Sequence, residues 1–126
     1  MSAASHIVLR NQDCASIVER RRRNYFFLYA ALRDVAPPIS GELPAGACPL
    51  FYPLPIADKV SAMARLLARG VETVDFWRLR HPMAPPVGEI PEVDKLRETI
   101  LELPVHQDLS PADMDHVAAC VRELIG

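Results

Sequence analysis

Proline constrains the fold of this chain more than any other residue, because twelve prolines stand among 126 residues. A proline ring fixes φ and removes a backbone N–H donor, so proline is poorly tolerated within helices and central strands. Most of the prolines cluster at residues 37–38, 44–55, 82–86 and 91. The clusters predict connections and sheet edges, with helices and strands between them.

A long leading helix is predicted over residues 13–34. Its apolar side chains recur at helical spacing at Cys14, Ile17, Val18, Tyr25, Leu28, Tyr29 and Leu32. Phe26 and Phe27 lie off that stripe, so this helix needs a second packing partner. That partner is either another domain or residues 7–9, folded back from a flexible N-terminal segment over residues 1–12.

Residues 49–126 are predicted to form an α+β core of short elements. Strands are predicted over 50–54, 71–77 and 100–103, and helices over 58–69, 92–99 and from Ser110 onward. In the helix over 58–69, one apolar face carries Val60, Met63, Ala64 and Leu67. Gly70 stands where a left-handed cap would end that helix. Prolines around the first strand favour an edge position for it.

The last helix has the clearest local start signal. Ser110 is a favoured N-cap, Pro111 suits the first helical position, and Asp113 completes a capping box. An apolar stripe follows at Met114, Val117, Ala118, Val121, Leu124 and Ile125. Layer packing then predicts one domain over residues 1–126, with a short, mostly antiparallel sheet covered by helices on one side.

Charge and cysteine content exclude several classes of function. A net charge of −2 with 24% charged residues gives no electrostatic argument for nucleic acid or an acidic membrane. Neither a signal pattern nor a transmembrane run is present. Three scattered cysteines form no metal spacing, so reduced thiols in the cytoplasm are expected. The run Arg20–Arg23 points in four helical directions and favours a solvated or interdomain surface.

The sequence contains no nucleophile motif and no glycine-rich phosphate loop that would indicate a catalytic centre. The only lysines are Lys59 and Lys95. His81 follows the predicted strand 71–77 in a proline-rich loop, and loops at strand ends often contact ligands. No catalytic or metal-binding residue is assigned, and His81 is the one candidate binding residue.

Two segments resemble a known family. Residues 66–77 (LLARGVETVDFW), followed by His81 and Pro82, resemble a helix ending at glycine, a strand, an aromatic residue and a histidine. Residues 103–114 (LPVHQDLSPADM) are similar to the closing signature of the same family. Arg22 and Asn24 also resemble its helix leading out of a large domain. The chain is thus similar to the C-terminal small domain of DegT/StrS-type pyridoxal-phosphate (PLP) sugar aminotransferases.

The resemblance implies part of an aspartate-aminotransferase-like (fold type I) enzyme, usually a homodimer. Such enzymes move an amino group between glutamate and a nucleotide-linked keto-sugar, and their large domain carries the Schiff-base lysine and the phosphate cup. Lys59 and Lys95 lie in the small-domain pattern, so the resemblance implies PLP in the whole family but none in this chain alone. His81 matches the family histidine that approaches the substrate. Lys59 replaces a frequent arginine, and Gln107 a frequent proline.

Two functions follow from these observations. In the first, the chain is not catalytic alone and completes a split enzyme with a PLP-binding large domain. In the second, it is a non-catalytic binding or assembly module that retains the fold. This alternative stays open because proteins of one fold can have unrelated functions. The expected partners are that large domain or further copies of this chain.

Overall fold

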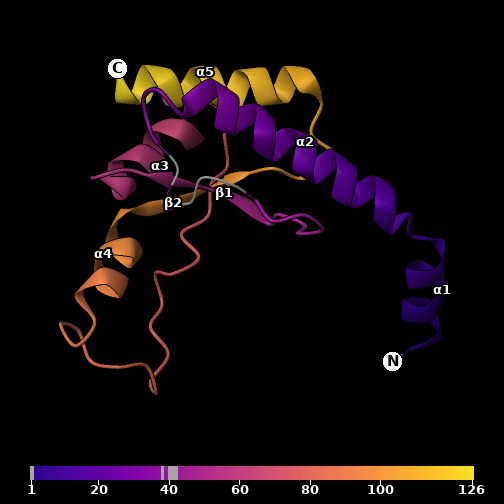
Figure 1. Cartoon of the computed structure of the whole chain (residues 1–126), viewed down its shortest axis with the longest axis horizontal. Coiled ribbons are helices and arrows are strands. Elements are labelled where there is room, and N and C mark those ends of the chain that lie inside the picture. Colours follow the sequence, from indigo (N-terminus) through magenta and orange to yellow (C-terminus); the bar gives the residue numbers. More distant parts are fainter. Residues whose placement is uncertain (1, 38, 40–42) are drawn as a thin grey trace.

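The computed structural model describes residues 2–37, 39 and 43–126, and it confirms an α+β fold (Figure 1). Pro38, in the first proline cluster, lies outside the described residues. The elements in chain order are α1 (Ala3–Asn11), α2 (Cys14–Leu32), β1 (Phe51–Pro55), α3 (Lys59–Leu67), α4 (Pro91–Thr99), β2 (Ile100–Pro104) and α5 (Pro111–Ile125).

The sheet consists of β1 and β2, paired antiparallel with Pro53 opposite Glu102. Within the described residues β1 pairs only with β2, which agrees with the edge position that its prolines predicted. The predicted strand over 71–77 is wrong. Only Val74 pairs with Glu102, through one isolated bridge, and the chain turns at once, with the Arg78 N–H donating to the Asp75 carbonyl. The outer edge of β2 is available, but the Phe76 N–H donates to the Glu102 side chain instead of a strand carbonyl, so the pairing stops after one bridge.

Three helices form a layer on one face of the sheet. α5 packs against both α2 and α3, while α2 contacts β1 and α3 contacts β2. The strand side chains that face this layer are Tyr52, Leu54, Leu101 and Leu103, all fully buried. The ring centroids of Tyr25 and Tyr52 lie 5.2 Å apart, which joins α2 to β1. The core therefore lies between this helical layer and one sheet face.

The start of α5 confirms the capping prediction. Ser110 Oγ accepts from the Asp113 N–H at 3.2 Å, and Asp113 Oδ2 accepts from the Ser110 N–H at 2.8 Å. The hydrogen bond from the Ser110 hydroxyl, with that from its N–H, holds the pKa of Asp113 below its ordinary value. The buried side chains of α5 are Met114, Val117, Ala118, Cys120 and Val121.

The structure buries a different face of α3 from the apolar face noted in the sequence. Ala62 and Leu66 are buried in the core, whereas Val60 is 75% exposed and Leu67 is 63% exposed. Gly70 has φ of 78° and ends the helical segment as predicted. Both faces of α3 carry apolar residues, and the contacts with α5 and β2 decide which face is buried.

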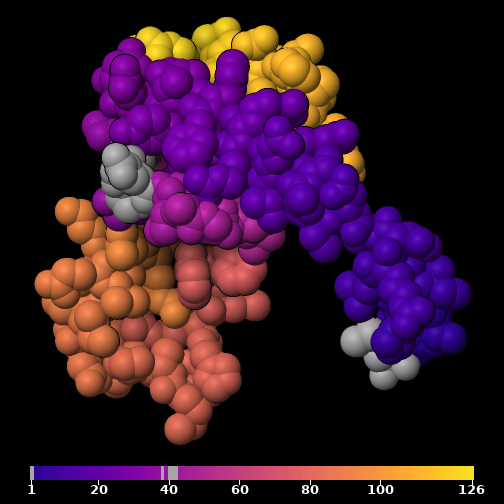
Figure 2. Space-filling model, turned by 45° about the vertical axis from the view of Figure 1, so that its right-hand side comes forward, coloured from indigo at the N-terminus to yellow at the C-terminus, as the bar shows by residue number. Residues whose placement is uncertain are grey.

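Residues 3–11 form α1, a helix that the sequence reasoning did not predict. None of its residues is buried, and it stands away from the rest of the chain (Figures 1 and 2). Residues 7–9 therefore do not fold back over α2. Phe26 stays 41% exposed, while Phe27 packs against the core. An exposed Phe26 supports the prediction of a contact surface on α2, and Phe27 belongs partly to the core.

The arginine run on α2 links that helix to the chain around it. Arg21 Nε donates to Gln107 Oε1 at 2.8 Å. Arg22 Nη1 donates to the carbonyls of Pro44 and Ala47, and its guanidinium lies 5.4 Å from the Phe26 ring centroid. These arginines tie α2 to neighbouring segments and form no basic stripe.

Candidate functional site

The sheet has a second face, away from the helical layer, that carries Phe51, Pro53, Ile100 and Glu102. Strand side chains alternate between faces, which places these residues opposite Tyr52 and Leu101. Residues 74–77 run beside the outer edge of β2, where Val74 pairs with Glu102. The Phe76 ring is 6.3 Å from the Phe51 ring and 5.3 Å from the Trp77 ring. Phe76 is 56% exposed and Trp77 is 50% exposed, so this aromatic group is only thinly covered.

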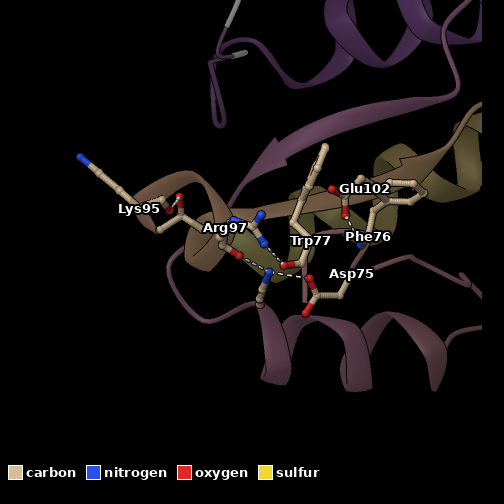
Figure 3. Close-up of polar contacts among 8 residues, drawn as sticks. Asp75, Phe76, Trp77, Lys95, Arg97 and Glu102 are labelled. Carbon is tan, nitrogen blue, oxygen red and sulfur yellow. Dashed lines mark hydrogen bonds and ion pairs between the residues drawn. The ribbon is translucent and has the colours of Figure 1, made fainter. Parts of the chain in front are cut away.

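A polar cluster fixes the chain beside this face, and we call it the Lys59 cluster: Lys59, Asp75, Trp77 and Arg97. Lys59 Nζ lies 2.6 Å from Asp75 Oδ1 and also donates to the Arg97 carbonyl (Figure 3). Both side chains of the ion pair are about nine-tenths buried, at 10% and 11% exposure. The pair connects α3 to residues 74–77 and to α4, three segments that otherwise share few contacts.

Arg97 and Trp77 form the other half of the Lys59 cluster. Arg97 Nη1 donates to the Trp77 carbonyl at 3.0 Å, and the guanidinium lies 5.8 Å from the indole centroid. A guanidinium within about 6 Å of an aromatic face is attracted to it electrostatically. The cluster therefore holds the Trp77 backbone and ring at the rim of the second face.

Glu102 is a buried carboxylate on this face, only 5% exposed. Its Oε2 accepts from the Phe76 N–H at 3.2 Å, and its Oε1 has no hydrogen-bond partner within the described part of the chain. Burial raises the pKa of Glu102 above its ordinary value, since a buried charge loses hydration. The sequence reasoning missed this residue, although a carboxylate inside the apolar run 100–103 was the available signal.

Two grooves meet at Trp77 and Arg97. One is apolar, about 330 Å³, and is lined by Ile39, Pro53, Trp77, Val93, Leu96, Arg97 and Ile100. The other is polar, about 450 Å³, and its lining includes the Lys59–Asp75 and Arg80–Asp94 ion pairs. The Gly88 N–H, followed by Arg80, holds the pKa of Asp94 below its ordinary value. The charges of the polar groove are thus largely paired within the chain.

Large exposed apolar side chains continue along the chain beyond the grooves. Over residues 76–96 they are Phe76, Trp77, Leu79, Met83, Val87, Ile90, Val93 and Leu96. Isolated exposed apolar residues are normal, but a dense series in one segment is typical of a surface that another protein covers. These exposed apolar side chains lie beside the Lys59 cluster.

Solved structures of known proteins are similar to this arrangement. A DegT DnrJ EryC1 StrS aminotransferase from Brucella abortus is similar over 87% of this chain, with 28% identity and a TM-score of 0.72. The aminotransferase TlmJ from Streptoalloteichus hindustanus is similar over 86% of this chain, with 28% identity and a TM-score of 0.67. The chain resembles part of a DegT/StrS-type aminotransferase. The resemblance seen in its sequence is confirmed.

The similarity is confined to part of those enzymes. This chain spans about 31% of the Brucella protein and 32% of TlmJ. DesV of S. venezuelae shares the fold over 88% of this chain and 32% of its own, with 20% identity and a TM-score of 0.76. No family model matches the sequence, and no curated protein matches it. About two thirds of each aminotransferase therefore has no counterpart in this chain.

The lysines of this chain do not fit PLP. Lys59 is engaged by Asp75 and the Arg97 carbonyl, and freeing its amine would leave a nearly buried carboxylate unpaired. Lys95 lies on the exposed side of α4 and points away from the Lys59 cluster (Figure 3). A Schiff-base lysine needs a cavity that also holds the cofactor ring and phosphate. The described part of the chain offers no such setting for either amine.

His81, the candidate substrate residue, lies in the exposed loop after the Lys59 cluster. Its Nδ1 accepts from the Met83 N–H at 3.1 Å, and it lines neither groove. The structure therefore does not bring His81 together with the cluster, and its substrate role stays a prediction. His116, in α5, contacts the Arg69 carbonyl at 2.9 Å and Cys120.

Among residues 2–37, 39 and 43–126, no group of three or more His, Cys, Asp or Glu side chains could hold a metal ion. Within the same residues, no helix is both long and apolar enough to cross a membrane.

Proposed function

We propose that this chain acts as the small-domain part of a DegT/StrS-type, PLP-dependent sugar aminotransferase and is not catalytic by itself. A PLP-binding large domain, supplied by another polypeptide or by the rest of a longer one, would complete the enzyme. The observation that carries the proposal is the match over 87% of this chain to only 31% of an aminotransferase. The thinly covered second sheet face and residues 76–96 support it, because they offer a surface for a large partner.

In the complete enzyme this chain would help to close the active site over the keto-sugar. His81 is the residue that we assign to the sugar. Its Nδ1 accepts from the Met83 N–H, so the neutral ring carries its proton on Nε2. Nε2 is then a donor suited to a hydroxyl or phosphate oxygen of the substrate. The transfer of the amino group would depend on groups of the large domain.

The isolated chain provides the first test. After incubation with PLP and reduction with borohydride, peptide mass mapping should find no stoichiometric label on Lys59 or Lys95, and no visible Schiff-base absorbance should develop. Stoichiometric labelling accompanied by turnover of glutamate would overturn the proposal that the chain is incomplete.

A chimera provides the second test. The matching segment of the Brucella abortus aminotransferase would be replaced by this chain, and the purified chimera mixed with PLP and glutamate. We expect the Schiff-base absorbance to form and to change on addition of glutamate. In the His81→Ala chimera, the glutamate reaction should persist while the reaction with keto-sugar is weakened. A chimera that binds PLP but reacts with neither substrate would contradict the proposal.

The alternative is a binding or assembly module that retains the fold. The specific observation in its favour is the ion pair of Lys59 with Asp75. Lys59 lines the polar groove, but its amine is engaged by Asp75 and is not offered to a ligand there. A module would bind a partner through residues 76–96, but its chimera would react with neither glutamate nor keto-sugar, although the lysine of the large domain could still form the Schiff base. The two substrate reactions therefore separate the two functions.

A further inference from the structure

The outer face of α3 carries an apolar seam that is largely exposed, with Met63 at its inner margin packed against the core. Val60, Met63, Ala64 and Leu67 follow the spacing i, i+3, i+4 and i+7, which places them along one side of two helical turns. Val60 is 75% exposed, Leu67 is 63% exposed and Ala64 is exposed, while Met63 is half-buried. We call these four residues the α3 seam. The opposite side of the helix already serves the core through Ala62 and Leu66.

A groove of about 550 Å³ runs beside the α3 seam. The four seam residues form one wall, and Glu72, Thr73, Asp75 and Arg78 form the other. Asp75 is taken by Lys59, but the side chains of Glu72 and Arg78 are exposed and find no partner among the described residues. The groove therefore has one apolar wall, and the opposite wall carries one carboxylate, of Glu72, and one guanidinium, of Arg78, that are not paired within the described residues.

The order of residues in the α3 seam is symmetric about its centre. Large side chains stand at both ends, Val60 and Leu67, and the small Ala64 lies beside Met63 in the middle. An antiparallel second copy, related by a twofold axis near Ala64, would set Val60 against the second copy's Leu67 at both ends. The small central residue allows the two helix axes to approach closely. A twofold contact must be self-complementary in this way.

The edge charges favour the same occupant. Under a twofold axis, Glu72 of one copy can face Arg78 of the other, and the pair occurs twice. A partner with a single sign of charge would gain at one of these residues and lose at the other. We propose that the α3 seam is a self-association surface, at which two copies of this chain pair their α3 helices antiparallel. This inference is independent of the proposed aminotransferase function.

Sedimentation of the full chain over a range of concentrations tests the self-association directly. Four side chains on two turns make a small contact, so we expect a weak, reversible dimer that accumulates as concentration rises. Leu67→Glu should weaken dimerisation at least about tenfold, because it places two carboxylates at the seam. Leu79→Glu is the matched control, since Leu79 is 86% exposed but lies outside the α3 seam. A monomer at every soluble concentration, or equal effects of both variants, would overturn the proposal.

Charge exchange tests the geometry without touching the seam. Glu72→Arg and Arg78→Glu should each weaken the homodimer, because each sets like charges opposite one another. Mixing the two variants should restore pairing as a heterodimer, since one then carries two positive and the other two negative residues at these positions. No recovery in the mixture would exclude the twofold pairing of Glu72 with Arg78.

Disulfide trapping locates the axis. In a Cys14→Ser, Cys48→Ser background, which removes the exposed native thiols, Ala64→Cys should give a disulfide-linked dimer under mild oxidation. Ser61→Cys is the control, because Ser61 is exposed on the same helix but lies off the seam. Equal trapping at both positions would indicate random collision and would contradict a contact centred on Ala64.

Discussion

The two faces of the sheet differ in how the chain covers them. On the helical side, Leu101 and Leu103 of β2 are completely buried in the core beneath the helical layer, where α3 contacts β2. On the second face, Glu102 is also buried, but Phe76, whose N–H donates to Glu102, and its neighbour Trp77 are half-exposed. One face is sealed by three helices and the other by a short segment held through the Lys59 cluster. The first face is therefore closed within the domain, whereas the aromatic residues at the second face stay half-exposed.

The largest effect is expected from the helical side. Leu101→Ala should lower the free energy of unfolding by about 4 kcal/mol, because it leaves a cavity in a closely packed core. Phe76→Ser on the second face is the matched control and should cost roughly 1 kcal/mol or less, since the ring is 56% exposed. Chemical unfolding followed by circular dichroism measures both. If both variants lost the same free energy of unfolding, the two faces of the sheet would contribute equally to stability.

The Lys59 cluster should have the next effect. Lys59→Met leaves the carboxylate of Asp75 nearly buried without its cation, which we expect to cost about 3 kcal/mol. Trp77 is the only tryptophan and lies in this cluster, so its fluorescence reports on the second face, while circular dichroism reports mainly on the helices. We expect the fluorescence transition to shift more than the helical one. The double variant Lys59→Met, Asp75→Asn should recover part of the loss.

The capping box of α5 belongs to the helical side but acts locally. Ser110→Ala should cost about 1 kcal/mol, because the Asp113 N–H loses its acceptor at the helix start. Asp115→Ala, on the exposed surface of the same helix, is a control that removes no cap. An unchanged unfolding midpoint in Ser110→Ala would mean that tertiary packing alone sets the start of α5.

The smallest effect concerns pH and the second face. Burial raises the pKa of Glu102 in the folded protein. The stability that the protonated carboxyl contributes is therefore fully present below the pKa of the unfolded chain, and it is lost as pH rises through the pKa of the folded protein. Glu102→Gln removes this titration and keeps an acceptor for the Phe76 N–H. The variant should therefore gain stability relative to wild type as pH rises from about 4 to 7. Chemical unfolding of wild type and variant at the two pH values measures this gain. A difference in stability that does not change with pH would contradict the raised pKa of Glu102.

The sequence by itself determined those features that depend on residues close together in the chain. Ser110, Pro111 and Asp113 specify the start of α5, because the cap is made between residues three apart. Gly70 ends the α3 segment for a similar reason, since its positive φ is a local requirement. The order of the elements from α2 to α5, apart from the strand wrongly predicted over 71–77, was visible in the residues, as were the edge strand β1 and the family resemblance.

Only the tertiary structure decided which apolar surfaces are buried. α3 has apolar residues on two sides, and the packing of α5 and β2 selects Ala62 and Leu66 over Val60 and Leu67. Residues 71–77 have strand propensity, yet they make one bridge because the chain turns after Val74. Glu102 belongs to the site because the Phe76 N–H, from a distant segment, donates to its carboxylate. In each case, contacts between segments distant in the chain decide the outcome. The spacing of residues along the chain does not show which of these contacts forms.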